Sequence, residues 1–422
     1  MKLTSLKFLF SFLLIALMLS AHAQQLPAAK PEAVGMSTER LKRFDAVFQK
    51  YVDDKRMAGS VTLVMRKGKV VYHEAFGYRD IASKSPMTRD AIFRIASQSK
   101  ALISVGIMIL QEEGKLLIGD PLSKYIPEFK STTVAVLKDG GGYEVVPARR
   151  EITLRDLLTH TAGIGYGEGV AADKWKQAGI QGWYFANRNE PIAATVARMA
   201  ALPNDAQPGE KWVYGYNTDI LGVVIEKASG IPLDQFIKTK ITDPLGMVDT
   251  YFYLPKEKTS RFTTTYALES GVLKRSPDES SMSGQGEYVD GPRKSFSGGA
   301  GLLSTATDYA RFLQMLLNGG ELNGMRILSP KSVELMTVSH TALIGFRPGE
   351  GFGLGFSVVT DVGTRGVPGS IGEYGWGGAY GSSYWVDPKE ELIVVYFKQL
   401  RPSDGLDDQQ KLRTLIYQAI VE

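Results

Sequence analysis

A serine and a lysine three residues apart are the first residues in this chain that could do chemistry. They are Ser97 and Lys100, and the apolar run 101–110 follows them directly. Residues three apart on a helix lie on the same face, so a helix here would bring the hydroxyl and the amine together. An amine that loses its hydration on burial gives up its proton more readily and can then accept the proton of a hydroxyl. The pattern therefore predicts a serine nucleophile activated by lysine.

The element that must position this pair is a buried helix. The run 101–110 is too apolar for a surface helix, and Gly114 follows it as a stop signal. Ser97 would then lie at the helix N-terminus, where unpaired N–H groups and the helix dipole favour a developing oxyanion. The Ser-x-x-Lys spacing alone is also common on solvated helix edges, so other residues must decide.

A second group of candidates lies in the turn 207–216, which ends in an aromatic cluster before a predicted helix. It contains Tyr214 and Tyr216. A phenol held near a lysine can act as a general acid or base. Most tyrosines in such places only pack in the core or anchor a loop, and the spacing alone favours that ordinary role.

A third segment, residues 374–381, is rich in glycine and precedes a predicted C-terminal hairpin. Glycine in a strand marks a bulge or a place where another group approaches the backbone closely. Such an edge could align an acyl group and offer the N–H of Ala379 to an oxyanion. An ordinary glycine-rich turn is the alternative interpretation.

Several other chemistries are excluded or disfavoured. The chain has no cysteine, which excludes disulfides and a thiolate nucleophile, and its four histidines make a histidine-rich metal site improbable. We therefore expect no metal and no cofactor. His160 stands in a Thr-His-Thr context that indicates a structural hydrogen bond, and His73 and His340 have no carboxylate nearby in sequence. We assign none of them a catalytic role.

The composition is that of an ordinary globular protein. The chain has 422 residues, 44% hydrophobic and 22% charged, with a formal net charge of +4. This balance implies neither nucleic acid nor a polyanionic surface as a partner, so we expect a small-molecule substrate.

The N-terminus predicts a secretory signal peptide over residues 1–23. A basic start with Lys2 and Lys7 precedes the apolar stretch 8–20, and Ala-His-Ala at 21–23 resembles a cleavage site. The apolar stretch is shorter than the ~20 residues that span a bilayer. We therefore expect a mature chain starting near Gln24 that is periplasmic or secreted and not held in a membrane.

Strand patterns at both ends surround a mainly helical middle. This predicts an α+β fold in which one antiparallel sheet is assembled from both termini. The predicted sheet domain comprises residues 24–117 and 296–422, and residues 118–295 form a mainly helical domain with long loops. The expected strands are 60–65, 69–73, 384–386 and 392–398, and the expected helices include 38–51, 154–158, 192–202, 221–228, 305–317 and 408–421.

Taken together, these segments resemble the penicillin-recognising serine hydrolases: class C β-lactamases, D-alanyl-D-alanine carboxypeptidases and family VIII carboxylesterases. The resemblance covers nearly all of the chain after residue 23 and keeps the family's order of motifs. Its carriers are Ser-Gln-Ser-Lys at 97–100, the stretch 154–163, the turn 208–214 with Asp-Ile-Leu-Gly at 219–222, Ser-Gly-Gly-Ala-Gly-Leu at 297–302, and 376–388.

The resemblance implies the β-lactamase/DD-peptidase-like fold and a set of roles. Ser97 would be the acylated nucleophile and Lys100 its proton acceptor. Tyr214 would relay a proton to the leaving group, and the N–H groups of Ser97 and Ala379 would bind the oxyanion. Tyr216 in an alternative register is the second candidate for the phenol.

Two departures from the lactamase pattern bear on the substrate. The Lys-Thr/Ser-Gly triplet is here Trp376-Gly377-Gly378, and Tyr216 stands where Tyr-x-Asn has its amide. We expect these four residues to contact the substrate. Loss of the cation removes a charge-assisted contact of roughly 1.5–3 kcal/mol to a substrate carboxylate. An aromatic wall instead favours apolar groups.

The sequence thus predicts an exported serine hydrolase that forms an acyl-enzyme, a carboxylesterase on neutral esters. A β-lactamase or a D-stereospecific peptidase or carboxypeptidase is the alternative within enzymes, so the partner is a small ester or lactam. A non-catalytic, penicillin-binding-like recognition protein is the alternative from another class. The intact Ser97, Lys100 and Tyr214 count against it.

Overall fold

The computed structural model describes residues 25–422, so the predicted signal peptide lies outside the described residues. Within residues 25–422, no helix is long and apolar enough to cross a membrane.

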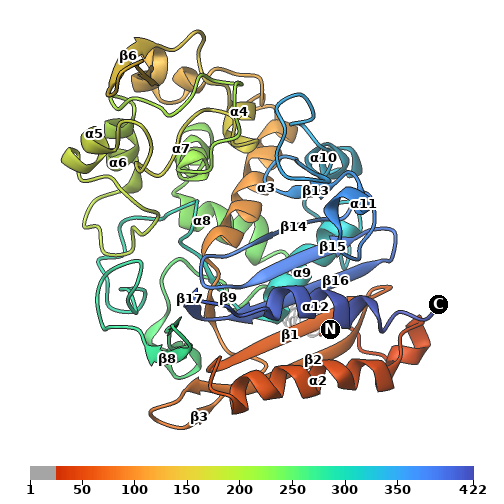
Figure 1. The fold of residues 1–422 in the computed structure, drawn as a ribbon. Helices are drawn as coiled ribbons and strands as arrows, with labels where there is room; N and C mark the ends of the chain where they lie inside the picture. Colours follow the sequence, from red (N-terminus) through yellow and green to blue (C-terminus); the bar gives the residue numbers. More distant parts are fainter. Residues whose placement is uncertain (1–24) are drawn as a thin grey trace, which may run out of the picture.

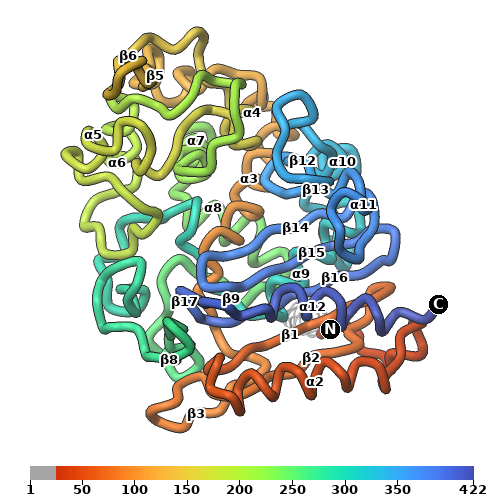
Figure 2. Tube along the Cα trace, in the orientation of Figure 1, coloured from red at the N-terminus to blue at the C-terminus, as the bar shows by residue number. Residues whose placement is uncertain are grey.

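An eight-stranded antiparallel sheet is the centre of the fold, and both ends of the chain build it. Strand β1 lies between β2 and β16, with Ser60 opposite Lys398 and Arg66 opposite Leu392. Figure 2 shows the red and orange N-terminal strands beside the blue C-terminal ones. In spatial order the strands are β12 (Glu350–Phe352), β13 (Ser357–Val359), β14 (Tyr374–Gly377), β15 (Ser383–Asp387), β16 (Leu392–Lys398), β1 (Gly59–Arg66), β2 (Lys69–Asp80) and β3 (Ser85–Pro86).

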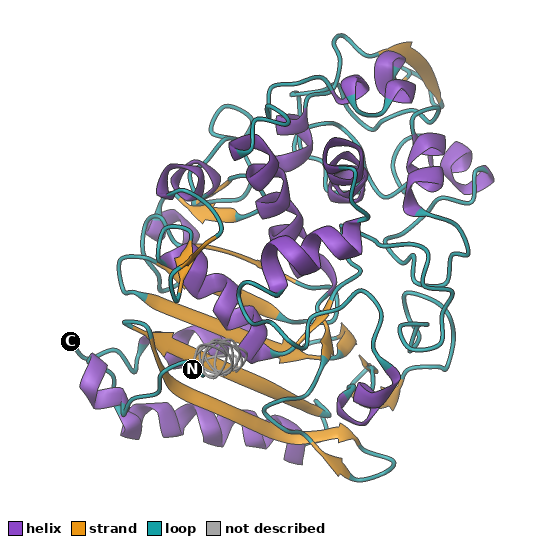
Figure 3. Ribbon diagram, turned by 180° about the vertical axis from the view of Figure 1, so that it is seen from behind, coloured by secondary structure: helices purple, strands orange, loops and turns teal. Residues whose placement is uncertain are grey.

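Helices cover both faces of this sheet (Figures 1 and 3). Helices α2 (Thr38–Asp53) and α12 (Asp408–Tyr417) pack on one face against Val394 and Tyr396 of β16. Helix α9 (Ala306–Leu317) lies on the other face, where Val395 of the same strand enters the main core. Successive side chains of a strand point to opposite faces, so a strand covered on both sides is apolar throughout.

The helical half lies beyond one side of the sheet, at the top of Figure 1. Its centre is α3 (Ser99–Glu112), whose residues 99–110 are all buried. It packs on α7 (Asn217–Ser229) and α8 (Leu233–Ile237). A Cβ at Gly106 would lie 2.9 Å from Ile225 Cδ1, so a glycine lets these two helices approach closely. The helical half also contains α4 (Leu154–Leu158), α5 (Ala172–Gln177) and α6 (Ile192–Met199), whereas α10 (Pro330–Met336) and α11 (Val362–Arg365) lie beside β13 (Figure 2).

Several short sheets lie outside the main sheet. The pair that matters for the site is β4 (Phe93–Arg94) with β9 (Leu303–Ser304), which leads into α3. The others are β5 (Thr133–Leu137) with β6 (Tyr143–Pro147), β7 (Tyr266–Glu269) with β8 (Val272–Arg275) and β17 (Leu400–Ser403), and β10 (Glu321–Leu322) with β11 (Met325–Arg326).

The predicted α+β fold, with an antiparallel sheet flanked by helices and a mostly helical part, is confirmed. One segment differs from its expected helical or loop character: residues 133–147 form the β5–β6 hairpin. Its turn contains three consecutive glycines with positive φ, at 140–142, a backbone conformation that favours a tight reversal over a helix.

Candidate active site

The turn that carries Ser97 leads directly into the buried helix. Ser97 lies in the 3₁₀ turn η2 (Ala96–Gln98), which α3 continues. The N–H of Ile95 donates to Leu302 O at 3.1 Å, which fixes the entry to the turn. Ala96 has φ 43°, a left-handed conformation unusual for a residue with a side chain. Ser97 is half-buried and reachable from the cleft, whereas Lys100 is only 1% exposed.

Lys100 has oxygen atoms on three sides. Its Nζ lies 2.7 Å from Gly299 O, 3.1 Å from the Tyr166 hydroxyl and 3.3 Å from Ser97 Oγ. A carbonyl oxygen can only accept, so the amine donates to Gly299. An uncharged amine has one more hydrogen for Tyr166, which leaves its lone pair for the Ser97 hydroxyl. The geometry therefore suits transfer of the Ser97 proton to Lys100.

The carbonyl that holds Lys100 is itself held by a buried carboxylate. Asp219 accepts from Ser297 Oγ at 2.6 Å and from the N–H of Gly299 at 3.0 Å. Ser297 Oγ also accepts from the N–H of Ala300 at 3.1 Å, which orients the peptide that contains the Gly299 carbonyl. Burial raises the pKa of Asp219, and the nearby Lys100 opposes this shift. A Cβ at Gly299 would come within 2.4 Å of Asp219 Oδ2, so this contact requires glycine.

The two candidate phenols occupy different environments. Lys100 Nζ lies 4.7 Å from the centre of the Tyr214 ring, and the Tyr214 hydroxyl accepts from Trp376 Nε1 at 3.1 Å. Tyr216 is fully buried and donates to Gly182 O at 2.7 Å. Tyr216 therefore belongs to the core beneath the site, contrary to the expectation that it contacts the substrate.

Tyr166 is a site residue that sequence reasoning missed. It comes from a glycine-rich loop, and its hydroxyl contacts Lys100. Burial raises its pKa well above the ordinary value, and Tyr214 adds to this shift, so the phenol stays neutral. A Cβ at Gly215 would lie 2.3 Å from the Gly165 carbonyl carbon, so the loop bearing Tyr166 packs directly on the turn bearing Tyr214.

The glycine-rich strand end lies directly against the nucleophile turn. A Cβ at Gly378 would lie 2.5 Å from Ile95 O, two residues before Ser97. Gly378 and Gly381 close a tight turn around Ala379, with Gly381 N donating to Gly378 O at 2.9 Å. The Ala379 N–H has no acceptor among the described residues, and the Ser97 N–H lies in the first turn of a helix. Both donors are thus available to a ligand oxygen.

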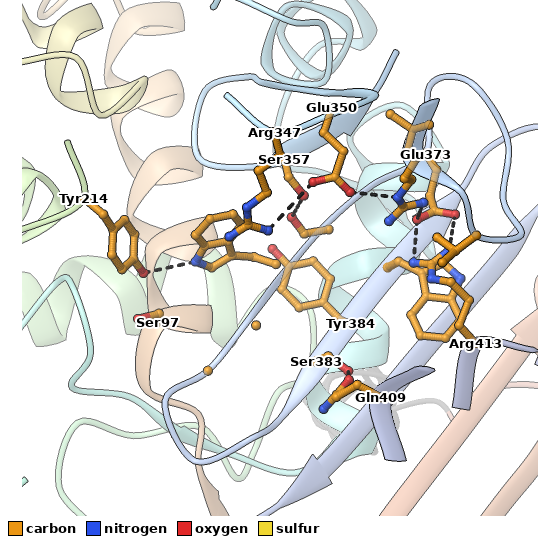
Figure 4. Close-up of a pocket in the computed structure, with 18 of the residues that line it drawn as sticks. Ser97, Tyr214, Arg347, Glu350, Ser357, Glu373, Ser383, Tyr384, Gln409 and Arg413 are labelled. Carbon is orange, nitrogen blue, oxygen red and sulfur yellow. Dashed lines mark hydrogen bonds and ion pairs between the residues drawn. The ribbon is translucent and has the colours of Figure 1, made fainter. Parts of the chain in front are cut away.

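These groups open into a cleft of about 580 Å³ (Figure 4). Trp376, Gly377 and Gly378 lie in its wall together with Ser97 and Tyr214. Trp183, Tyr166 and Tyr384 add further aromatic surface. Sequence reasoning did not find the charged residues of the far wall, which are Arg347, Glu350, Arg365, Glu373 and Arg413.

His160 and Asn217 support the site from behind. Asn217 Nδ2 lies 2.9 Å from His160 Nδ1, and both residues are buried. Burial and the charge of Lys100 lower the pKa of His160 well below its ordinary value, so its ring is neutral. Its centre lies 4.8 Å from that of the Tyr214 ring, which it helps to pack. Among residues 25–422 no cluster of three or more His, Asp or Glu side chains could hold a metal ion.

Two known proteins are similar to this chain over most of its length. Protein Rv1367c of Mycobacterium tuberculosis is 36% identical over 376 residues, which cover 86% of this chain and 90% of that protein. Esterase EstB of Burkholderia gladioli is 31% identical over 374 residues, or 84% of this chain and 88% of EstB.

The solved structure of EstCE1, described as a hydrolase with promiscuous acyltransferase activity, superposes with a TM-score of 0.77. It is 29% identical and covers 90% of this chain and 99% of EstCE1. The model of the Beta-lactamase family matches residues 44–418. With that match and a buried lysine beside the cleft serine, the chain belongs to the Beta-lactamase family and is a serine hydrolase.

Proposed function

We propose that this protein is a carboxylesterase that forms an acyl-enzyme on Ser97. The observation that carries the proposal is the contact of Ser97 Oγ with the buried Nζ of Lys100, at 3.3 Å, in an aromatic cleft. The similarity to EstB, an esterase, and to EstCE1, a hydrolase, supports it.

The first half of the reaction builds the acyl-enzyme. Ser97 Oγ attacks the ester carbonyl carbon while its proton passes to Lys100, and the carbonyl oxygen becomes an oxyanion. The N–H groups of Ser97 and Ala379 donate to that oxyanion. As it collapses, the bond to the alcohol oxygen breaks, and Tyr214 gives that oxygen its proton. Lys100 returns a proton to Tyr214 through the Tyr166 hydroxyl, which contacts Lys100 and is hydrogen-bonded to Tyr214.

The second half regenerates the serine. Water attacks the acyl carbonyl, its proton passes to the same basic groups, and Ser97 leaves with a proton as the acid is released. Tyr166 contributes a neutral hydrogen-bonding partner that holds Lys100 in place throughout.

The aromatic lining of the cleft favours an uncharged acyl group. Trp376 occupies the place where the lactamase pattern has a cation, and its indole bonds to Tyr214. Trp183 and Tyr384 also line the cleft, and an acyl group bound against this aromatic surface gains apolar burial. We therefore propose uncharged acyl groups as substrates. We also propose, on the basic and apolar composition of residues 1–23, that the protein is exported.

The test compares Ser97→Ala with Ser383→Ala. Ser383 also lines the cleft, but its hydroxyl bonds to Gln409. With 4-nitrophenyl butyrate, we expect Ser97→Ala to lose at least about 10⁴-fold in kcat/KM, as loss of a nucleophile does. Ser383→Ala should stay within a few-fold of the unmodified protein. Intact mass after a substrate pulse should show a butanoyl adduct unless Ser97 is replaced.

Two results would overturn the proposal. Full activity of the Ser97→Ala variant would show that Ser97 is not the nucleophile. Faster turnover of a chromogenic cephalosporin than of any ester would favour a β-lactamase instead.

A further inference from the structure

The far wall of the cleft carries an unbalanced positive charge. Three arginines and two glutamates line it: Arg347, Arg365, Arg413, Glu350 and Glu373. Four of these five are closely paired. Glu373 accepts from Arg365 at 2.9 Å and from Arg413 at 2.7 Å, and Arg365 also reaches Glu350 at 2.7 Å.

Arg347 is the remaining cation. Its nearest carboxylate oxygen is Glu350 Oε2 at 3.8 Å, and the other oxygen of that carboxylate is already held by Arg365. No hydrogen bond from the Arg347 side chain to another described residue exists, and the side chain is 56% exposed. Its guanidinium therefore has donors available for a ligand.

The Arg347 guanidinium is nevertheless held in a defined place. Its Cζ lies 4.7 Å from the centre of the Phe346 ring and 5.2 Å from that of Trp376. The turn that carries Arg347 packs closely on the backbone of Asp361, because a Cβ at Gly349 would lie 2.3 Å from Asp361 O. A guanidinium stacked on aromatic faces keeps its N–H edge free to form a bidentate pair with a carboxylate. Figure 4 shows Arg347 between Tyr214 and Glu350 on the cleft side.

We propose that Arg347 binds a carboxylate on the alcohol portion of the ester. The proposal rests on the esterase function and adds a preference at the far end of the substrate, while the acyl group stays uncharged. The assignment to the alcohol side follows from Trp376. Its indole nitrogen contacts the Tyr214 hydroxyl, which protonates the departing alcohol, and its ring contacts Arg347. The Trp376 indole thus lies between Arg347 and the place where the leaving alcohol oxygen is protonated.

The experiment uses two butanoyl esters of the same shape. One is 4-(butanoyloxy)benzoate, which has a free carboxylate, and the other is its uncharged methyl ester. The ratio of their kcat/KM values is compared between variants, so that their different intrinsic reactivity cancels. We expect Arg347→Gln to lower the ratio of charged to neutral ester about five- to tenfold, the value of a partly exposed bidentate pair. Arg347→Lys should give a ratio between those of the unmodified protein and Arg347→Gln, because lysine keeps the positive charge but cannot form a bidentate pair.

Lys211→Gln is the matched control. Lys211 is an exposed cation beside Trp212, which packs on Trp376, but it does not line the cleft. If direct contact with Arg347 causes the preference for the charged ester, and the overall positive potential does not, Lys211→Gln should leave the ratio of kcat/KM values unchanged. The effect of Arg347→Gln should also shrink in 0.5 M salt by screening, as expected for an exposed pair.

The outcomes separate this inference from the proposed function. If the unmodified protein turns over both esters and Arg347→Gln leaves the ratio unchanged, or Lys211→Gln lowers it equally, the carboxylate site is overturned and the esterase stands. If neither ester is turned over nor acylates Ser97, the esterase itself fails.

Discussion

At the scale of single residues, neighbouring groups decide which of them is the base. Burial keeps the Tyr166 phenol neutral, and His160 is neutral and pairs through its Nδ1 with Asn217. Lys100 is left as the group that both contacts Ser97 Oγ and has a lone pair available when uncharged. The buried Asp219 fixes the carbonyl on the other side of the amine.

The two tyrosines of the 207–216 turn give a prediction at this scale. Tyr214→Phe should lower kcat for 4-nitrophenyl butyrate by about 10²-fold or more, because it removes the proton donor for the leaving group. Tyr216→Phe should keep kcat within a few-fold and lower the free energy of unfolding by about 1 kcal/mol, since it deletes the buried bond to Gly182 O. Ester kinetics and urea unfolding measure both. The opposite pattern would show that Tyr216, and not Tyr214, is the catalytic phenol.

Sequence patterns revealed those site residues whose chemistry is local. Ser97 and Lys100 share one helix start, so their spacing and the apolar run marked them as candidates, and the order of the other motifs then supported their roles. Tyr166 and Arg347 were not predicted, because each reaches the site from a loop whose path depends on distant packing. For Tyr166 the alternating glycines at 163, 165 and 167 were a signal for close backbone approach. For Arg347 nothing in the local sequence indicates that it stacks on Trp376.

At the scale of elements, the approach of the β14 end to the turn η2 sets the oxyanion donors. Gly378→Ala would place a Cβ 2.4 Å from Ser382 Oγ and 2.5 Å from Ile95 O, so the two backbones must move apart. We expect kcat to fall about 10²-fold, as when an oxyanion donor is lost.

Gly377→Ala is the paired control for this change, because its Cβ would meet only Ser382 O, at 3.2 Å. Its kcat should change by a few-fold at most. Steady-state kinetics with 4-nitrophenyl butyrate checks both variants. Equal activity of the two would mean that the close contact at Gly378 does not position Ala379.

Element types were predictable where periodicity was strong. Helices α2 and α9 and strands β15 and β16 lie close to their expected ranges, because capping residues and apolar runs mark them. Strand β2 continues to Asp80, beyond the expected range 69–73, because pairing with β1 extends it to Gly77 and a short pairing with β3 continues it. Such pairing partners come from tertiary structure and leave no mark on the strand itself.

At the scale of the whole molecule, His73 links stability to pH. Burial, with Arg89 nearby, lowers its pKa from 6.5 to about 4, and its Nε2 is buried without a hydrogen-bond partner. Below pH 6.5 His73 binds a proton in the unfolded chain, whereas in the native protein it does so only near pH 4. Its contribution to stability is therefore complete above pH 6.5 and is lost as the pH falls toward 4.

The corresponding variant is His73→Gln, which cannot titrate. Between pH 7 and 4.5 the unmodified protein should lose roughly 2–3 kcal/mol more unfolding free energy than the variant. Urea unfolding followed by tryptophan fluorescence at both pH values measures the difference. Parallel losses would show that His73 is solvated in the native state.

The sheet that joins both termini also constrains how the protein is made. Strand β1 is buried along its whole length, and one of its two edges pairs only with β16. A nascent polypeptide that lacks β16 presents this apolar edge without a partner, and such edges promote aggregation. The Ala379 donor, too, comes from the late-synthesised part. We therefore expect the catalytic unit to close only after the last strands have been synthesised.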